Sequence, residues 1–170
     1  AYYTQQICAS LSQLSSYLDW KVIDQVIQLI HDSDNVAFFG TQFSHSVALH
    51  FQTDLLMLEK FTMAYMEQTN QLQCAKELDE NSVAIILTVS GHIFNGNQKM
   101  ISYIKKSNAK VVIITNDQDF DFGFEPDYVI GIGDPKYKRT GKHNLLTTME
   151  LMALRYYSIY YPDVKDNIIE

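Results

Sequence analysis

Two short polar segments of the chain carry the residue types that bind an anion. Residues 40–44 and 88–91 each combine a glycine with hydroxyl side chains, and each precedes a segment with helical periodicity. Hydroxyls donate hydrogen bonds, and the unpaired N–H groups of a helix start lie at the positive end of its dipole. The segments therefore suit a phosphate group. The candidate ligand-binding residues are Gly40, Thr41, Gln42, Ser44, Thr88, Ser90 and Gly91.

Ser44 and Ser90 also have a simpler interpretation as helix N-caps. A capping serine accepts a hydrogen bond from a backbone N–H of its own helix and needs no ligand. Either serine alone is better explained in this way. Two such loops at one edge of a sheet favour a ligand pocket instead.

Two further side chains are candidates for a general base. Moving a proton between adjacent carbons of a sugar requires a Glu or His with a suitable pKa, and Glu150 and His92 are placed for this role if the chain is an isomerase. Alternatively, neither residue is catalytic. Glu150 is then an exposed or ion-paired helix residue, and His92 is a partly exposed loop residue. His45 is interpreted as a first-turn helix residue. We find no nucleophilic triad and no metal-ligand spacing, and expect neither a metal nor a cofactor.

The elements that must position these residues alternate between two apolar patterns. Short continuous apolar runs, typical of buried parallel strands, are separated by segments with helical periodicity. Strands are expected near residues 36–39, 61–65, 83–89, 111–114 and 128–132, and a final long helix near 144–160. The alternation predicts a three-layer α/β/α sandwich with a parallel sheet of about five strands. Ligands of such sheets bind beyond the carboxyl ends of the strands, near the switch point of strand order.

Two helical segments precede the first strand. Their apolar residues recur at the helical period, and Asp19 is a plausible N-cap for the second segment. The two sets are Ile7, Leu11, Leu14 and Leu18, then Ile23, Val26, Ile27 and Ile30. We expect one domain over residues 1–170, with residues 1–33 packed on it.

The two loops resemble those of a known family. Residues 39–44 (F-G-T-Q-F-S), followed by Val47 and Ala48, resemble the first phosphosugar loop of sugar isomerase (SIS) domains, in which a strand ends in G-x-G-x-S. Residues 87–91 (L-T-V-S-G) resemble the second loop. The resemblance implies the flavodoxin-like SIS fold. With two leading helices, the chain looks most like the C-terminal effector domain of RpiR-family transcriptional regulators, separated from its helix-turn-helix domain.

Two positions depart from the family pattern. Gln42 stands where the first loop has its second glycine, and Ile93 stands where the second loop has a threonine. The resemblance therefore implies a diverged pocket. Its first implication is a phosphosugar-binding effector domain of a regulator of carbohydrate metabolism, which contacts DNA only through an upstream helix-turn-helix domain absent from this sequence. A phosphosugar isomerase is the alternative, and a scaffold that only dimerises is a third possibility.

Composition excludes several other classes of protein. The net charge of −7 disfavours nucleic acid as the ligand of this segment, and the basic cluster of residues 136–142 is interpreted as a solvated loop. We find no signal peptide and no membrane span, and Cys8 and Cys74 form no disulfide framework, which together indicate the cytoplasm. Four tyrosines crowd the end of the last helix, which predicts a homodimer. They are Tyr156, Tyr157, Tyr160 and Tyr161.

Overall fold

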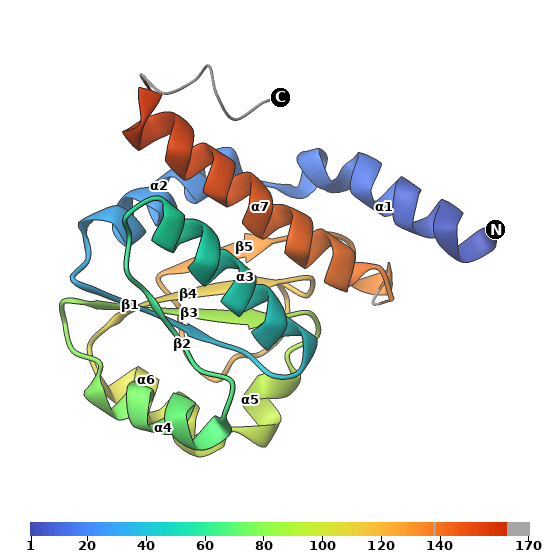
Figure 1. Ribbon diagram of the computed structural model, residues 1–170. Coiled ribbons are helices and arrows are strands. Elements are labelled where there is room, and N and C mark those ends of the chain that lie inside the picture. The colour runs from blue at the N-terminus through green and yellow to red at the C-terminus, as the bar shows by residue number, and fades with distance from the viewer. Residues whose placement is uncertain (138, 163–170) are drawn as a thin grey trace.

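The computed structural model describes residues 1–137 and 139–162, which form a five-stranded parallel sheet with helices on both faces (Figure 1). The strands are β1 (Asn35–Phe39), β2 (Met63–Ala64), β3 (Ser82–Thr88), β4 (Lys110–Thr115) and β5 (Tyr128–Gly131). The helices are α1 (Tyr2–Tyr17), α2 (Trp20–Asp32), α3 (Phe43–Met57), α4 (Gln68–Glu77), α5 (His92–Gly96), α6 (Gln98–Lys106) and α7 (Gly141–Tyr160), with a 3₁₀ turn at Pro135–Tyr137. Residues 163–170 of the expected domain lie outside the described residues.

The strand order is β2-β1-β3-β4-β5, and all neighbouring pairs are parallel. The predicted α/β architecture is confirmed, with β1, β3 and β4 in the sheet interior. The second strand is shorter than expected. Only Met63 and Ala64 pair with β1, and Phe61 is 77% exposed, because this strand lies at the sheet edge with a neighbour on one side only.

Alternate residues of each strand face opposite helix layers. In β1, Val36 and Phe38 pack in one apolar cluster with α2, α3 and α7. Ala37 and Phe39 pack in the other cluster, with α4, α5 and α6. Figure 1 shows these two helix layers on either side of the sheet. Burial on both faces explains why the central strands are continuous apolar runs rather than alternating ones.

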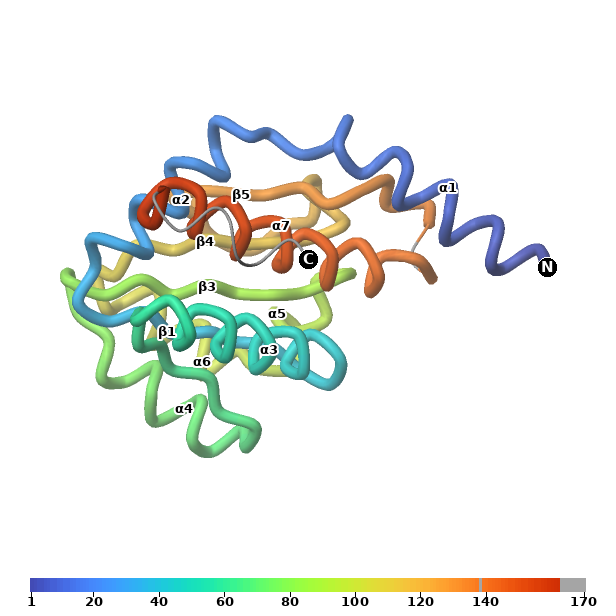
Figure 2. The backbone as a smooth tube through the Cα atoms, turned by 45° about the horizontal axis from the view of Figure 1, so that its top comes forward, coloured from blue at the N-terminus to red at the C-terminus, as the bar shows by residue number. Residues whose placement is uncertain are grey.

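The two leading helices attach to the sheet layer in different ways. The carboxylate of Asp19 accepts hydrogen bonds from the backbone N–H groups of Lys21 and Val22, so the predicted N-cap of α2 is confirmed. Helix α2 buries four apolar side chains in the core, whereas α1 buries only Leu14. Helix α1 continues beyond the sheet, with the N-terminus far from the body of the molecule (Figure 2).

Polar contacts join α1 to the start of α7. The Ser10 hydroxyl donates to Asn144 Oδ1 at 3.1 Å and accepts from Thr140 Oγ1 at 3.0 Å. The Tyr3 hydroxyl donates to the carbonyl of Arg139 at 3.4 Å. Helix α7 begins at Gly141, one turn before the predicted boundary, and this earlier turn is the part that α1 contacts.

The tyrosines at the end of α7 pack within the chain. Tyr156 is buried, and its hydroxyl lies 2.9 Å from Nδ1 of His31. Tyr160 stacks on the same imidazole, and the Tyr161 hydroxyl donates to the carbonyl of Leu58 at 2.6 Å. Tyr156 therefore needs no partner chain to cover it, whereas Tyr160 and Tyr161 stay partly exposed, and the homodimer remains a prediction. No helix in the described part of the chain has the length and apolar character to cross a membrane.

Candidate functional site

The switch point of the sheet lies between β1 and β3. From β1 the chain passes to β2 on one side, and every later strand lies on the other side. The loops after β1 and β3 flank this point at the carboxyl edge, where open α/β sheets bind their ligands. Residues 40–42 and 89–91 form these two loops, so the topology brings the two predicted segments to one edge of the sheet.

Gly40 and Gln71 fix the shape of the first loop. A side chain on Gly40 would lie 3.0 Å from the backbone nitrogen of His45, so the close approach of the loop to α3 requires glycine. The Gly40 N–H donates to Oε1 of Gln71 at 3.2 Å, and Nε2 of Gln71 donates to the Gly40 carbonyl at 3.0 Å. Gln71 is buried on α4, and its amide thereby satisfies both backbone groups at the end of β1.

Gln42 adopts a backbone conformation that glycine favours. Its φ is 51° and its ψ is −122°, in a region that side-chain-bearing residues rarely occupy. The loop thus keeps the backbone geometry of the glycine that the family pattern has here, although the residue is glutamine. Such strain is kept only where the surrounding structure imposes it, and it gathers at functional sites.

The second loop turns at Gly91, whose φ is 78°. A Cβ atom at this position would also overlap the ring of Phe120, because it would lie only 2.6 Å from the nearest ring carbon. The backbone N–H of Gly91 donates to Oγ1 of Thr88 at 2.9 Å. Thr88 thus shapes the loop from its buried position, and the half-buried Ser90 comes between the two.

Neither serine acts as a helix cap. The N-cap positions belong to Gln42 and Gly91, and neither helix start has a side-chain capping hydrogen bond. The capping interpretation of Ser44 and Ser90 is therefore wrong. Ser44 lies in the first turn of α3 and is 8% exposed. Within the described residues, neither hydroxyl has a hydrogen-bond partner, so both are available to a ligand.

Four of the seven predicted residues line two neighbouring spaces, whereas Ser44, Thr88 and Gly91 line neither of them. The first-loop cavity, of about 460 Å³, is lined by Gly40, Thr41, Gln42, His45, Ser46, Met66, Gln68, Gln71 and Asn97. The Ser90 hollow, of about 640 Å³, is lined by Tyr3, Phe43, Val89, Ser90, Arg139 and Lys142. Gln42 and Phe43 are consecutive residues and line one space each, so the start of α3 separates the two.

Arg139 and Lys142 were not among the predicted site residues. They belong to the basic cluster that the sequence indicated as a solvated loop, of which Lys138 lies outside the described residues. Both side chains are exposed, but they line the same hollow as Ser90. Two cations opposite a free hydroxyl make this hollow suitable for an anion.

The two candidate bases lie outside both spaces. Glu150 is on the outer side of α7, where its Oε1 is 3.6 Å from Nε2 of His50, and both side chains are about half exposed. His92 is exposed at the start of α5 and lines neither the first-loop cavity nor the Ser90 hollow. Their assignment as bases stays a prediction. In the described part of the chain, no group of three or more His, Cys, Asp or Glu residues could hold a metal ion.

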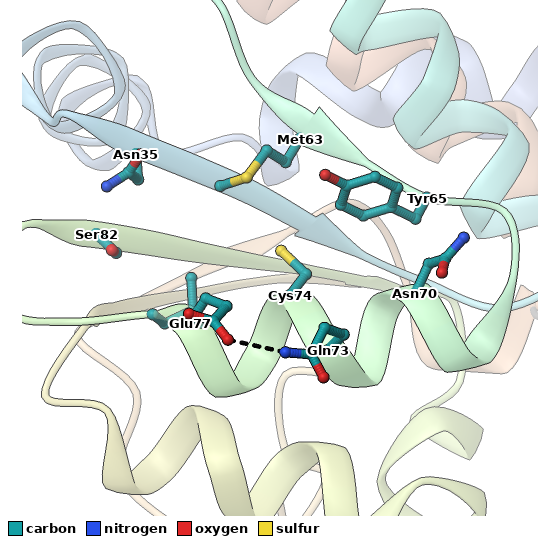
Figure 3. Close-up of a pocket in the computed structure, with 9 residues that line it drawn as sticks. Asn35, Met63, Tyr65, Asn70, Gln73, Cys74, Glu77 and Ser82 are labelled. Carbon is teal, nitrogen blue, oxygen red and sulfur yellow. Dashed lines mark hydrogen bonds between the residues drawn. The ribbon is translucent and has the colours of Figure 1, made fainter.

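Another cavity, of about 380 Å³, lies between the β1–β2 edge of the sheet and α4 (Figure 3). Asn35 and Ser82 stand at the opposite strand ends from the two loops, and Glu77 accepts a hydrogen bond from Gln73. Burial raises the pKa of the Cys74 thiol in its wall to about 11. The thiol is therefore protonated at neutral pH, which makes Cys74 a poor nucleophile.

No protein-family model and no curated protein matches this sequence. Solved structures do match. The NanR protein of Vibrio vulnificus, complexed with ManNAc-6P, superposes with a TM-score of 0.79 and 14% identity over 92% of this chain and 61% of NanR. A phosphoheptose isomerase from Francisella tularensis gives 0.75 and 14% over 91% and 94% of the two chains. The sugar isomerase domain of an RpiR transcription factor from Sphaerobacter thermophilus gives 0.62 and 15% over 92% and 94%.

The chain therefore has the fold of SIS domains, and the resemblance that the two loops indicated is confirmed at the level of the fold. Both sugar-phosphate isomerases and transcription factors are among the matching structures. The chain spans 61% of the length of NanR, so NanR contains a further part with no counterpart here.

Proposed function

We propose that this chain is the phosphosugar-binding effector domain of a bacterial RpiR-type transcriptional regulator of carbohydrate metabolism. The observation that carries the proposal is the Ser90 hollow. In a chain of net charge −7, Arg139 and Lys142 line the same space as the free Ser90 hydroxyl at the switch point of the sheet. A phosphate group needs this combination of cations and hydrogen-bond donors.

The start of α7 adds to the anion preference of the hollow. This helix is 20 residues long, its N-cap Thr140 makes no side-chain capping hydrogen bond, and Lys142 lies in its first turn. The N-terminal end of a long helix carries a partial positive charge and unpaired N–H groups. The cationic side chains, the helix end and the serine therefore all favour the same ligand chemistry.

The matching structures support a sugar phosphate as the ligand. NanR was solved with ManNAc-6P, and the RpiR domain belongs to a transcription factor. An isomerase is less well supported, because Glu150 pairs with His50 away from both spaces, and because exposed His92 has no described partner to orient it. We attribute contact with DNA to an upstream helix-turn-helix domain, as the resemblance to RpiR-family regulators implies.

We further propose that the domain acts as a homodimer, through the face shared by α3 and α7. An apolar groove of about 500 Å³ lies there, and it includes Met57 and Leu154, which are 79% and 59% exposed. Side chains of this size are costly to leave in water. The groove also includes Tyr157, one of the four tyrosines from which the sequence predicted a dimer.

Calorimetry with a panel of hexose and pentose phosphates tests the proposed ligand. Removing a hydrogen bond to a charged group typically costs about 1.5–3 kcal/mol, so Ser90→Ala should weaken binding roughly 10–150-fold. The sequence predicts the same loss for Ser44→Ala, although Ser44 lines neither space. Arg139→Gln and Lys142→Gln should weaken binding as well. Ser158→Ala and Lys136→Gln are matched controls outside the two spaces, and they should bind as the wild type does.

Two results would contradict the proposed function. If no sugar phosphate stabilises or binds the wild-type protein, the ligand class is wrong. If the protein binds sugar phosphates and also interconverts their aldose and ketose forms, the chain is an isomerase and the assignment as an effector domain is wrong. Unchanged affinity in both serine variants would show that the loops only shape the fold.

A further inference from the structure

His45 is a buried histidine with an unpaired ring nitrogen. Its side chain is 4% exposed, and its Nε2 has no hydrogen-bond partner in the described structure. Buried polar atoms in native proteins are nearly always paired, and an unpaired one normally has a functional explanation. His45 lines the first-loop cavity, so a group bound in that cavity is the natural partner.

Most of the neighbouring amides of the cavity are already engaged, the exception being the exposed amide of Gln42. Gln71 uses both ends of its amide on the backbone of Gly40. Gln68 donates its amide to Oδ1 of Asn97, which joins α4 to the start of α6. These side chains hold the walls in place and leave Nε2 of His45 without a partner. Nε2 is itself buried, so a ligand in the cavity can pair with it only if the wall beside it moves.

The walls of this cavity are polar but not acidic or basic, apart from the imidazole of His45. Amides, the hydroxyls of Thr41 and Ser46, and one methionine make up the lining together with His45, with no Asp, Glu, Lys or Arg. Cationic side chains instead line the Ser90 hollow on the other side of the α3 start. The charge distribution thus separates a phosphate-type space from a space suited to hydroxyl groups.

We propose that the first-loop cavity binds the uncharged, hydroxyl-bearing part of the ligand, with Nε2 of His45 hydrogen-bonded to a sugar hydroxyl. The proposal rests on the proposed function, because the sugar is taken to be attached to the phosphate bound beside it. A hydroxyl both donates and accepts, so it pairs with Nε2 in either neutral tautomer of the ring. His45 then provides selectivity among sugars, and the phosphate contacts provide selectivity for an anion.

The decisive experiment compares the binding of sugar phosphates with the binding of inorganic phosphate in two variants of His45. Calorimetry is run with ManNAc-6P, a panel of hexose and pentose phosphates, and inorganic phosphate, on His45→Phe and His45→Gln. We expect His45→Phe to bind sugar phosphates at least tenfold more weakly while its affinity for inorganic phosphate is unchanged. His45→Gln keeps an amide that can hydrogen-bond and should recover part of the lost affinity. Thr53→Phe, at an exposed position of the same helix outside both spaces and outside the α3–α7 groove, is the control and should behave as the wild type.

Stability provides an independent readout. If Nε2 is unpaired without ligand, an apolar ring at position 45 should leave the denaturant midpoint equal or higher, although binding falls. A structural role for the histidine predicts the opposite, with a lower midpoint and unchanged binding. Equal weakening of sugar phosphates and inorganic phosphate would also overturn the inference, since His45 would then act on the loop as a whole. Absence of any sugar-phosphate binding in the wild type would remove the proposed function itself.

Discussion

Arg155 holds both carboxylate oxygens of Asp24. Its Nε donates to Oδ1 and its Nη2 to Oδ2, each at 2.8 Å, and the pair joins α7 to α2. This hydrogen bonding, together with the charge of the guanidinium, holds the pKa of Asp24 below its ordinary value of 3.8 despite an opposing effect of burial. The two helices that lie over the same face of the sheet are thus joined by one bidentate ion pair at their exposed edge.

The pair predicts a pH-dependent contribution to stability. Because the folded pKa of Asp24 is lowered, the contribution is complete above the ordinary value and is lost as the pH falls through the folded pKa. Asp24→Asn should lower the denaturant midpoint slightly at neutral pH, since both side chains are more than a third exposed and solvent screens them. The variant and wild-type midpoints should converge in acid. Asp119→Asn, an exposed control, should show no such difference, and parallel curves at all pH values would contradict the assignment.

Replacing Gln42 by glycine should stabilise the protein. The φ of 51° is costly for glutamine, and relieving such strain is worth about 1 kcal/mol after the flexibility of glycine in the unfolded chain is counted. Denaturant unfolding measures the gain. Gln42→Ala keeps the first side-chain carbon and should gain nothing. Sugar-phosphate affinity in Gln42→Gly should be equal or tighter, because the backbone conformation is retained.

Ile93→Thr should lower stability, although it restores the family residue. Ile93 is 1% exposed and packs in the cluster beneath the sheet, so the new hydroxyl would be buried there. The loss of apolar contacts and the buried hydroxyl should cost about 1–2 kcal/mol in the free energy of unfolding. Because the family pattern has threonine here, sugar-phosphate binding by this variant should be equal to or tighter than that of the wild type. Calorimetry at a temperature where the variant is folded separates the two effects.

Gln71→Met should destabilise the protein by about 2 kcal/mol. Methionine fills a similar volume but leaves the N–H and carbonyl of Gly40 without their buried partner. Buried polar groups that lose their partner keep the full cost of desolvation. Gln73→Met on the same helix is the matched control, since Gln73 is exposed and bonds only to Glu77. Equal midpoints for the two variants would show that the contact to Gly40 contributes nothing.

A charge on the α3–α7 face should disrupt the proposed dimer. Leu154→Lys places an ammonium group in the apolar groove, whereas Ile159→Lys changes a less exposed position on the same helix outside the groove. Sedimentation at micromolar concentration should give a dimer for the wild type and a monomer for Leu154→Lys. A monomeric wild type would remove the dimer from the proposed function.

Local patterns were enough to predict most of the fold. The apolar runs at β1, β3 and β4 and the Asp19 cap depend on neighbours in sequence, and their positions were correct within a residue or two. The length of β2 was not predictable in this way, because the extent of an edge strand depends on how far it pairs with its single neighbour, and Met63 and Ala64 pair with only part of β1. The start of α7 was also misplaced, since its first turn is set by contacts with α1 rather than by an apolar period.

The candidate site was predictable only in part. The hydroxyl loops stand out because strand, glycine and serine are consecutive in the sequence. Gln71 is a site residue only because it contacts Gly40, which lies 31 positions away. The unpaired nitrogen of His45 and the place of Arg139 beside Ser90 likewise follow from tertiary packing. Nothing in the types or spacing of these residues distinguishes them from ordinary helix and loop residues.

The polar contacts of α1 should couple the docking of this helix to anion binding in the Ser90 hollow. Tyr3 lines the hollow and donates to the carbonyl of Arg139, while Ser10 bonds to the two ends of the first turn of α7. With one buried side chain, α1 should open at a lower free energy than α2, and its amide hydrogens should exchange sooner. If an anion binds in the Ser90 hollow and draws Arg139 inward, as the proposed function implies, this opening equilibrium should change. By thermodynamic reciprocity, the factor by which the anion changes the docking equilibrium of α1 equals the factor by which docking of α1 changes the affinity for the anion.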